Sequence, residues 1–128
     1  MSDPFPTGDL PSWLDQIELD RQADDLVRAG AAGALNRYRN MDRDWEDLAT
    51  WDGVALHQPS LFLAGAHDAS VSWTAAAIAA FPTTLPELRT SRLLESAGHW
   101  VHQERPDEVN ELLVAFMREN LGAPRAAT

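Results

Sequence analysis

Cysteine is absent from this 128-residue chain, and so are long apolar runs. Without thiols, neither a disulfide nor a thiolate metal site can form. No apolar stretch approaches the roughly 20 residues that cross a bilayer, so we expect no membrane partner. The opening residues, Met1–Pro6, contain neither a basic nor an apolar segment and do not resemble a signal peptide. We therefore expect a cytoplasmic protein.

Positive charge is also scarce. Ten basic residues stand against 20 acidic ones, which gives a net charge of −10. Nucleic acids and anionic membranes bind clustered positive charge, so we expect neither as a partner. The hydrophobic fraction of 45% and the charged fraction of 23% are typical of a globular chain, and the length fits one domain or a piece of one.

Signatures of cofactor binding are missing or incomplete. No glycine-rich phosphate loop of the GxGxxG or Walker type occurs, so we expect no nucleotide. His99, His102 and Glu104 lie close together in sequence, but a zinc site normally needs three or four ligands at recognised spacing. We therefore expect neither a metal nor any other cofactor.

The first fifty residues have helical patterns. Apolar residues recur among charged ones from about residue 13, and Gly30 ends this first helix. A second helix is predicted over 35–41. A third is predicted over 42–50, with Asp42 or Asp44 as its cap.

From about Trp51 the pattern changes to alternating strands and helices. Strands are predicted at 61–65 and 88–94, an alanine-rich helix at 75–80 that stops before Pro82, and an amphipathic helix at 105–120. This order is typical of an α/β fold with a parallel sheet. Two strands are too few for such a sheet, so we expect part of a larger layered domain.

Three residues are candidates for chemistry. Asp68 follows the first predicted strand and His99 follows the second, at the edge where parallel sheets place their sites. Taken singly, Asp68 could equally cap the next helix, and His99 could be an incidental surface residue. Tyr38, flanked by arginines, could donate a hydrogen bond into a pocket or simply anchor its helix. Acid before histidine, 31 residues apart, is the chain order of α/β-hydrolase triads.

Most of the chain resembles the epoxide hydrolase family of the α/β-hydrolase superfamily. The resemblance rests on segments similar to a late cap helix, the cap Tyr-Arg-Asn motif, the triad-acid loop and the triad-histidine segment, namely Leu10–Leu14, Leu35–Trp45, Leu61–Asp68 and Gly98–Asn110. It implies the C-terminal part of an α/β-hydrolase fold. Residues 1–52 would be the C-terminal part of the helical cap, or lid, domain, and 53–128 the C-terminal part of the core.

The resemblance also implies roles for individual residues. Tyr38 would bind the epoxide oxygen, His99 would act as the base, and Asp68 would orient it. Trp100 would contact the substrate, a small epoxide that the full-length protein converts to a vicinal diol through an alkyl-enzyme ester.

The nucleophile expected of this fold has no counterpart here. Its elbow, Gly-x-nucleophile-x-Gly, needs two glycines four positions apart. No such pair occurs among the glycines, which are residues 8, 30, 33, 53, 65, 98 and 122. The His-Gly-x-Pro segment, the first half of the sheet and a second cap tyrosine are missing as well. We therefore expect a truncated, mis-started or split protein, inactive and poorly stable without the N-terminal half of the fold.

Two alternatives stay open at this point. The chain could be part of another α/β-hydrolase, such as a haloalkane dehalogenase or an esterase, because the nucleophile that would decide is missing. It could also be an acidic interaction module without chemistry, which would leave the arrangement of Tyr38, Asp68 and His99 to chance.

Overall fold

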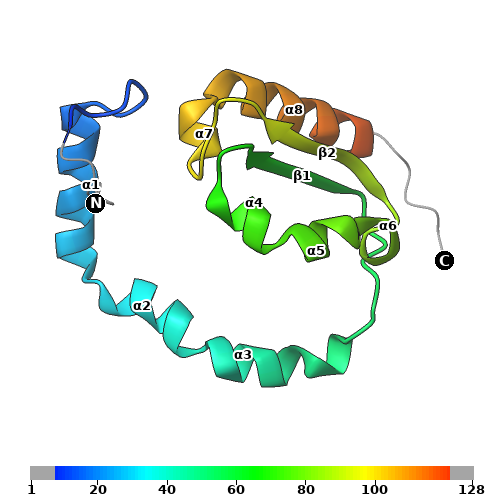
Figure 1. Cartoon of the computed structure of the whole chain (residues 1–128). Helices are drawn as coiled ribbons and strands as arrows, with labels where there is room; N and C mark the ends of the chain where they lie inside the picture. Colours follow the sequence, from blue (N-terminus) through cyan, green and yellow to red (C-terminus); the bar gives the residue numbers. More distant parts are fainter. Residues whose placement is uncertain (1–7, 122–128) are drawn as a thin grey trace. The chain divides into compact units, whose positions relative to one another are not determined.

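A computed structural model of the protein describes residues 8–121 (Figure 1). Contacts divide the chain into two compact units, Met1–Asp52 and Gly53–Thr128. That these units are parts of a cap and a core stays a prediction. Within residues 8–121, none of the helices combines the length and the apolar character needed to cross a bilayer.

The first unit is helical, as predicted. It contains α1, α2, α3 and a 3-10 turn, which span Gln16–Ala29, Ala32–Arg39, Met41–Leu48 and Ala49–Trp51. Gly30 ends α1 in a left-handed conformation, with φ of 74°, and its N–H donates to the Leu26 carbonyl at 2.8 Å. The prediction that Asp42 or Asp44 caps the third helix was wrong. Asn40 is the N-cap, and Asp42 and Asp44 lie in the first turn, where the helix dipole favours negative charge.

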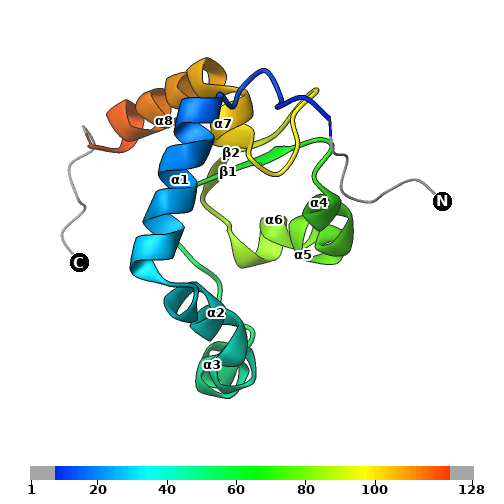
Figure 2. The same ribbon diagram turned by 90° about the vertical axis from the view of Figure 1, so that its left-hand side faces the viewer.

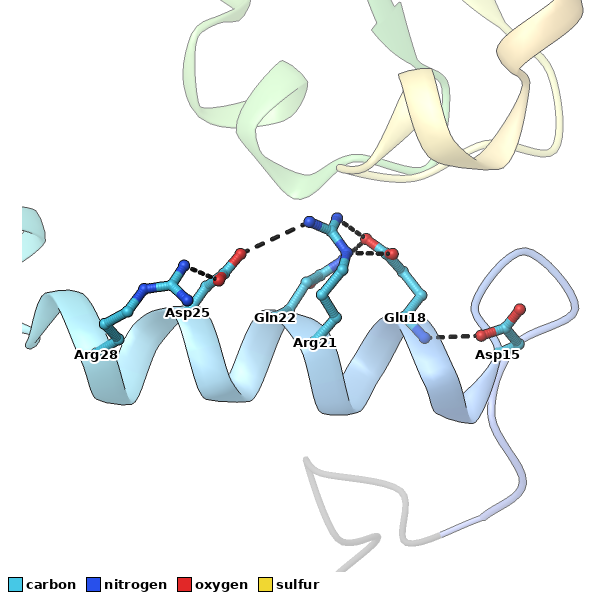
Figure 3. Close-up of polar contacts among 6 residues, drawn as sticks. All are labelled: Asp15, Glu18, Arg21, Gln22, Asp25 and Arg28. Atoms are coloured by element: carbon cyan, nitrogen blue, oxygen red, sulfur yellow. Dashed lines mark hydrogen bonds and ion pairs between the residues drawn. The ribbon is translucent and has the colours of Figure 1, made fainter.

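Local side-chain contacts explain why α1 begins at Gln16 rather than near Trp13. The Asp15 carboxylate accepts the Glu18 N–H at 2.8 Å and so caps the helix. Figure 3 shows acids and bases three or four positions apart along its surface, with Arg21 donating to both Glu18 oxygens at 2.6 and 2.9 Å. The hydrogen bond from Arg21 is the main cause that lowers the pKa of Glu18 to about 2. The charged face of α1 is thus internally paired.

The second unit holds a small parallel sheet. Its elements are β1, α4, α5, α6, β2, α7 and α8, which span Ser60–Gly65, Ala69–Trp73, Ala75–Ala79, Phe81–Thr84, Leu88–Leu94, Val101–Glu104 and Pro106–Leu121. β1 and β2 pair in parallel, with Gly65 opposite Leu94. The predicted strands and their parallel direction are confirmed, as is the long helix α8.

Between the strands, the structure differs from the single helix predicted over 75–80. Three short helices occupy this stretch. α5 ends before Pro82 as expected, but a new helix, α6, starts at Phe81 with Pro82 in its first turn, where a missing N–H leaves no hydrogen bond unmade. α4 and α7 have five and four residues, too few to show a helical period in sequence.

Helices cover both faces of the sheet, α8 on one and α4–α6 on the other (Figures 1 and 2). Neighbouring residues of a strand point to opposite faces, and β1 uses both. Phe62 meets Phe81 of α6 edge to face, with ring centroids 5.0 Å apart. Leu63 packs on the other face against the buried core, which among the described residues consists of Leu94, Ala97 and Val109.

We expect Asp15→Ala to weaken the start of α1 by about 1 kcal/mol, because the Glu18 N–H loses its acceptor. Amide hydrogen exchange of Glu18 measures the effect, and its protection should fall. Asp24→Ala removes a carboxylate inside the same helix and is the control. Equal protection of Glu18 in the two variants would contradict the capping role.

Candidate active site

Asp68 lies just past the carboxyl end of β1 and caps α4. Its Oδ1 accepts the Ser70 N–H at 2.8 Å, and its own N–H donates to the Gly65 carbonyl at 3.1 Å. Its side chain is only 12% exposed. The simpler expectation, that Asp68 caps the following helix, is therefore correct, and it leaves the second carboxylate oxygen available.

That second oxygen meets His99. Nδ1 of His99 lies 3.0 Å from Oδ2 of Asp68. A carboxylate only accepts, so Nδ1 carries the shared proton and Nε2 of a neutral ring is left as the acceptor. The His99 side chain is 67% exposed, so the imidazole is accessible to solvent. The two residues thus have the geometry of a base and its orienting acid.

The carboxylate of this pair is held in its ionised form. The Ser70 backbone N–H is the main cause that lowers the pKa of Asp68 from its ordinary value of 3.8, with smaller contributions from the Ser70 side chain and from His99. Asp68 is therefore charged throughout the neutral range. An ionised acid is what an orienting residue needs if the imidazole is to accept a proton.

Gly65 allows the two loops to approach each other. Built onto Gly65, a Cβ would lie 2.6 Å from the Ala97 carbonyl carbon and closer still to the carbonyl oxygens of Ala97 and Gly98. A backbone hydrogen bond joins the two loops at this point: the His67 N–H donates to the Ala97 carbonyl at 2.9 Å. No side chain larger than hydrogen fits without moving the backbone that leads to His99.

The other predicted site residues differ in their placement. Trp100 is half exposed and stands edge-on to the His99 ring at 5.3 Å, beside the acid and base. Tyr38 lies on α2 in the first unit and is 68% exposed. The structure thus brings Asp68, His99 and Trp100 together within the second unit, while Tyr38 belongs to the other unit.

Glu104, which lies near His99 and His102 in sequence, binds backbone rather than a metal ion. Both oxygens of Glu104 accept backbone N–H groups, from Gly98 at 2.7 Å and from Trp100 at 3.0 Å. Within residues 8–121, no group of three or more histidine or acidic side chains is placed to hold a metal ion. Sequence reasoning missed Gly65 and Glu104 as site residues; the only signals were a glycine ending a strand and an acid shortly after the histidine.

Known proteins resemble this chain closely. It is 56% identical to an epoxide hydrolase from an endophytic Streptomyces, with a TM-score of 0.87 over 89% of this chain and 34% of that one. Epoxide hydrolase A from Mycobacterium thermoresistibile is 43% identical, with a TM-score of 0.79 over 90% and 35%. Epoxide hydrolase A of Mycobacterium tuberculosis strain H37Rv is 42% identical over 114 residues, which are 89% of this chain and 34% of that protein. No protein-family model matches.

These likenesses place the chain among proteins of the α/β-hydrolase fold, and the expected fold class, the C-terminal part of that fold, is confirmed. Within that class the chain is a homologue of the epoxide hydrolases. It spans about a third of the length of the relatives it matches, 30% and 34% for two from Mycobacterium tuberculosis.

We expect Gly65→Ala to separate Asp68 from His99, because the added carbon meets backbone carbonyls rather than a movable side chain. Overpacking of this kind costs about 1–3 kcal/mol. Long-range ¹H–¹⁵N correlations of the imidazole report whether Nδ1 or Nε2 of His99 carries the proton, and the preference for Nδ1 should be lost. Gly33→Ala, where a Cβ meets nothing within 4 Å, is the control. An unchanged preference in Gly65→Ala would be evidence against the close approach.

We expect the stability contributed by the Asp68 carboxylate to be lost only at acidic pH. The pKa of Asp68 is lowered in the folded chain, so its carboxylate contributes stability that is fully present above pH 3.8 and is lost as the pH falls through the lowered value. The ¹³Cγ chemical shift of Asp68, followed from pH 7 downward, measures this directly. His99→Ala should raise the pKa only part of the way, because Ser70 is the larger cause. Titration of Asp68 at or above 3.8 in the unaltered chain would contradict the assignment.

Proposed function

We propose that this chain is the part of an epoxide hydrolase that supplies the base, its orienting acid and one cap tyrosine. The hydrogen bond of 3.0 Å between His99 and Asp68, at the ends of neighbouring parallel strands, carries the proposal. The substrate is a small epoxide and the product a vicinal diol. Relatives named epoxide hydrolases at 42–56% identity support this reaction over dehalogenation, ester hydrolysis or a purely binding role.

The first half of the reaction forms an ester. A carboxylate nucleophile attacks an epoxide carbon, the carbon–oxygen bond breaks, and the released oxygen takes a proton from a tyrosine hydroxyl. Tyr38 is one such donor. A donor of this kind stabilises the negative charge that develops on the oxygen. The nucleophile needs no base to activate it, because a carboxylate is already ionised near neutral pH. Trp100, which stands beside His99, contributes an apolar wall for the substrate.

The second half hydrolyses the ester and uses the pair seen here. Nε2 of His99 takes a proton from water, and the water oxygen attacks the ester carbonyl carbon. The ester bond breaks, the diol oxygen takes the proton from the imidazolium, and the second water proton returns to the tyrosine. Asp68 stabilises the imidazolium and keeps the Nδ1–H tautomer in place, since its other oxygen is fixed by Ser70.

The chain alone lacks the nucleophile, so we propose that it is inactive without the N-terminal half of the fold. That half is its proposed partner. Cytoplasmic location and the lack of nucleic-acid and membrane partners belong to the same proposal, and the net charge of −10 supports the latter two.

A chimera tests the proposal. In it, this chain replaces the matching third of the Streptomyces epoxide hydrolase. We expect the chimera to convert an aromatic epoxide to its diol and the 128-residue chain alone to give no diol above buffer. His99→Ala in the chimera should consume about one epoxide per enzyme and then stall as the ester, with turnover lowered 10²–10⁴-fold, the usual contribution of a general base.

Three further variants separate the roles. His102→Ala, three residues from His99, should leave turnover unchanged and is the matched control. Asp68→Asn should slow ester hydrolysis, whereas Tyr38→Phe should slow ester formation. Diol formation by the chain alone, or unchanged turnover of His99→Ala in the chimera, would overturn the proposal.

A further inference from the structure

The histidine loop, defined here as Glu95–Trp100, carries His99 on backbone that packing alone does not fix. The His99 ring is largely exposed, so buried neighbours do not hold it. Ser96 has φ of 57°, a left-handed conformation that residues other than glycine rarely adopt. Such a conformation persists only where the surrounding contacts impose it.

Burial of Ala97 and the hydrogen bond from His67 to its carbonyl hold the middle of the loop. Further contacts come from two adjacent residues at the end of α7. Glu104 Oε2 accepts the Gly98 N–H at 2.7 Å, and Glu104 Oε1 accepts the Trp100 N–H at 3.0 Å. These two N–H groups flank His99 in the chain. At the start of the loop, Arg105 donates to the Glu95 carbonyl at 2.8 Å. One carboxylate therefore holds the backbone on both sides of the base.

The chemistry of these contacts favours a fixed position. Hydrogen bonds to an ionised acceptor are roughly twice as strong as those between neutral groups. Glu104 is itself held close, because its own N–H donates to the Trp100 carbonyl at 2.9 Å. Gly98 is part of the arrangement, since a Cβ there would lie 3.3 Å from Glu104 Oε1 and press on the carboxylate.

We propose that Glu104 is a positioning residue that fixes the backbone on either side of His99 and so sets Nδ1 against Asp68. The inference rests on the proposed role of the Asp68–His99 pair and adds a second carboxyl-bearing residue to that site, one that does not touch the substrate. If Glu104 only stabilised α7, its loss would lower stability without changing the protonation pattern of the His99 ring in folded molecules.

The ratio of Nδ1–H to Nε2–H tautomers of neutral His99 tests this on the full 128-residue chain, by long-range ¹H–¹⁵N correlations. We expect Glu104→Ala to lower the ratio roughly tenfold. A displaced His99 would lose the hydrogen bond from Nδ1 to the charged Asp68, and one such bond has about this effect. Glu104→Gln keeps one acceptor oxygen and should lower it less. Glu111→Ala removes an exposed carboxylate from α8 and is the matched control. In an Asp68→Asn background, Glu104→Ala should add nothing.

The outcomes separate the two proposals. An unchanged ratio in Glu104→Ala, beside a fall in Asp68→Asn, would overturn the positioning role and leave the acid–base pair intact. No preference for Nδ1–H in the unaltered chain, or no effect of Asp68→Asn, would overturn the pair itself. If Glu104→Ala unfolds the chain, Glu104→Gln decides, and an unchanged ratio in that variant overturns the positioning role.

Discussion

The parallel pairing of β1 with β2 is the constraint on which the rest of the site depends. Gly65 and Leu94 are opposite each other in the register, so both strands end at the same edge of the sheet and their loops leave side by side. The missing side chain at Gly65 then lets the second loop come close enough for backbone hydrogen bonds to join the two. Asp68 and His99, far apart in sequence, face each other because of this pairing.

Much of this arrangement could be predicted because it leaves marks in sequence. Leu61–Gly65 is a short apolar run between turn residues, the pattern of a strand that packs on both faces, as Phe62 and Leu63 do here. α8 is long enough to display an apolar stripe at helical spacing. With acid and histidine placed after successive strands, these features sufficed to predict an α/β fold with a parallel sheet and to place Asp68 and His99 at the same edge of it. The α/β-hydrolase fold class rested on the resemblance to a known family.

What could not be predicted depends on contacts that no residue pattern encodes. α4 and α7 are shorter than two helical turns, so no period can reveal them. Glu104 accepts hydrogen bonds from main-chain N–H groups, which every residue except proline carries. The identity of the residues that it binds therefore gives no signal in the sequence. In sequence, the nearby His99 and His102 even suggested that Glu104 could be a metal ligand. The role of Tyr38 rests on resemblance alone, because it belongs to the first unit.

The contacts that fix the acid and the histidine have one further consequence. The hydrogen bonds among them all come from one continuous stretch of chain, from β1 through Arg105. A recombination event that exchanges this stretch as a block therefore transfers a finished acid–base geometry, whatever nucleophile the recipient carries.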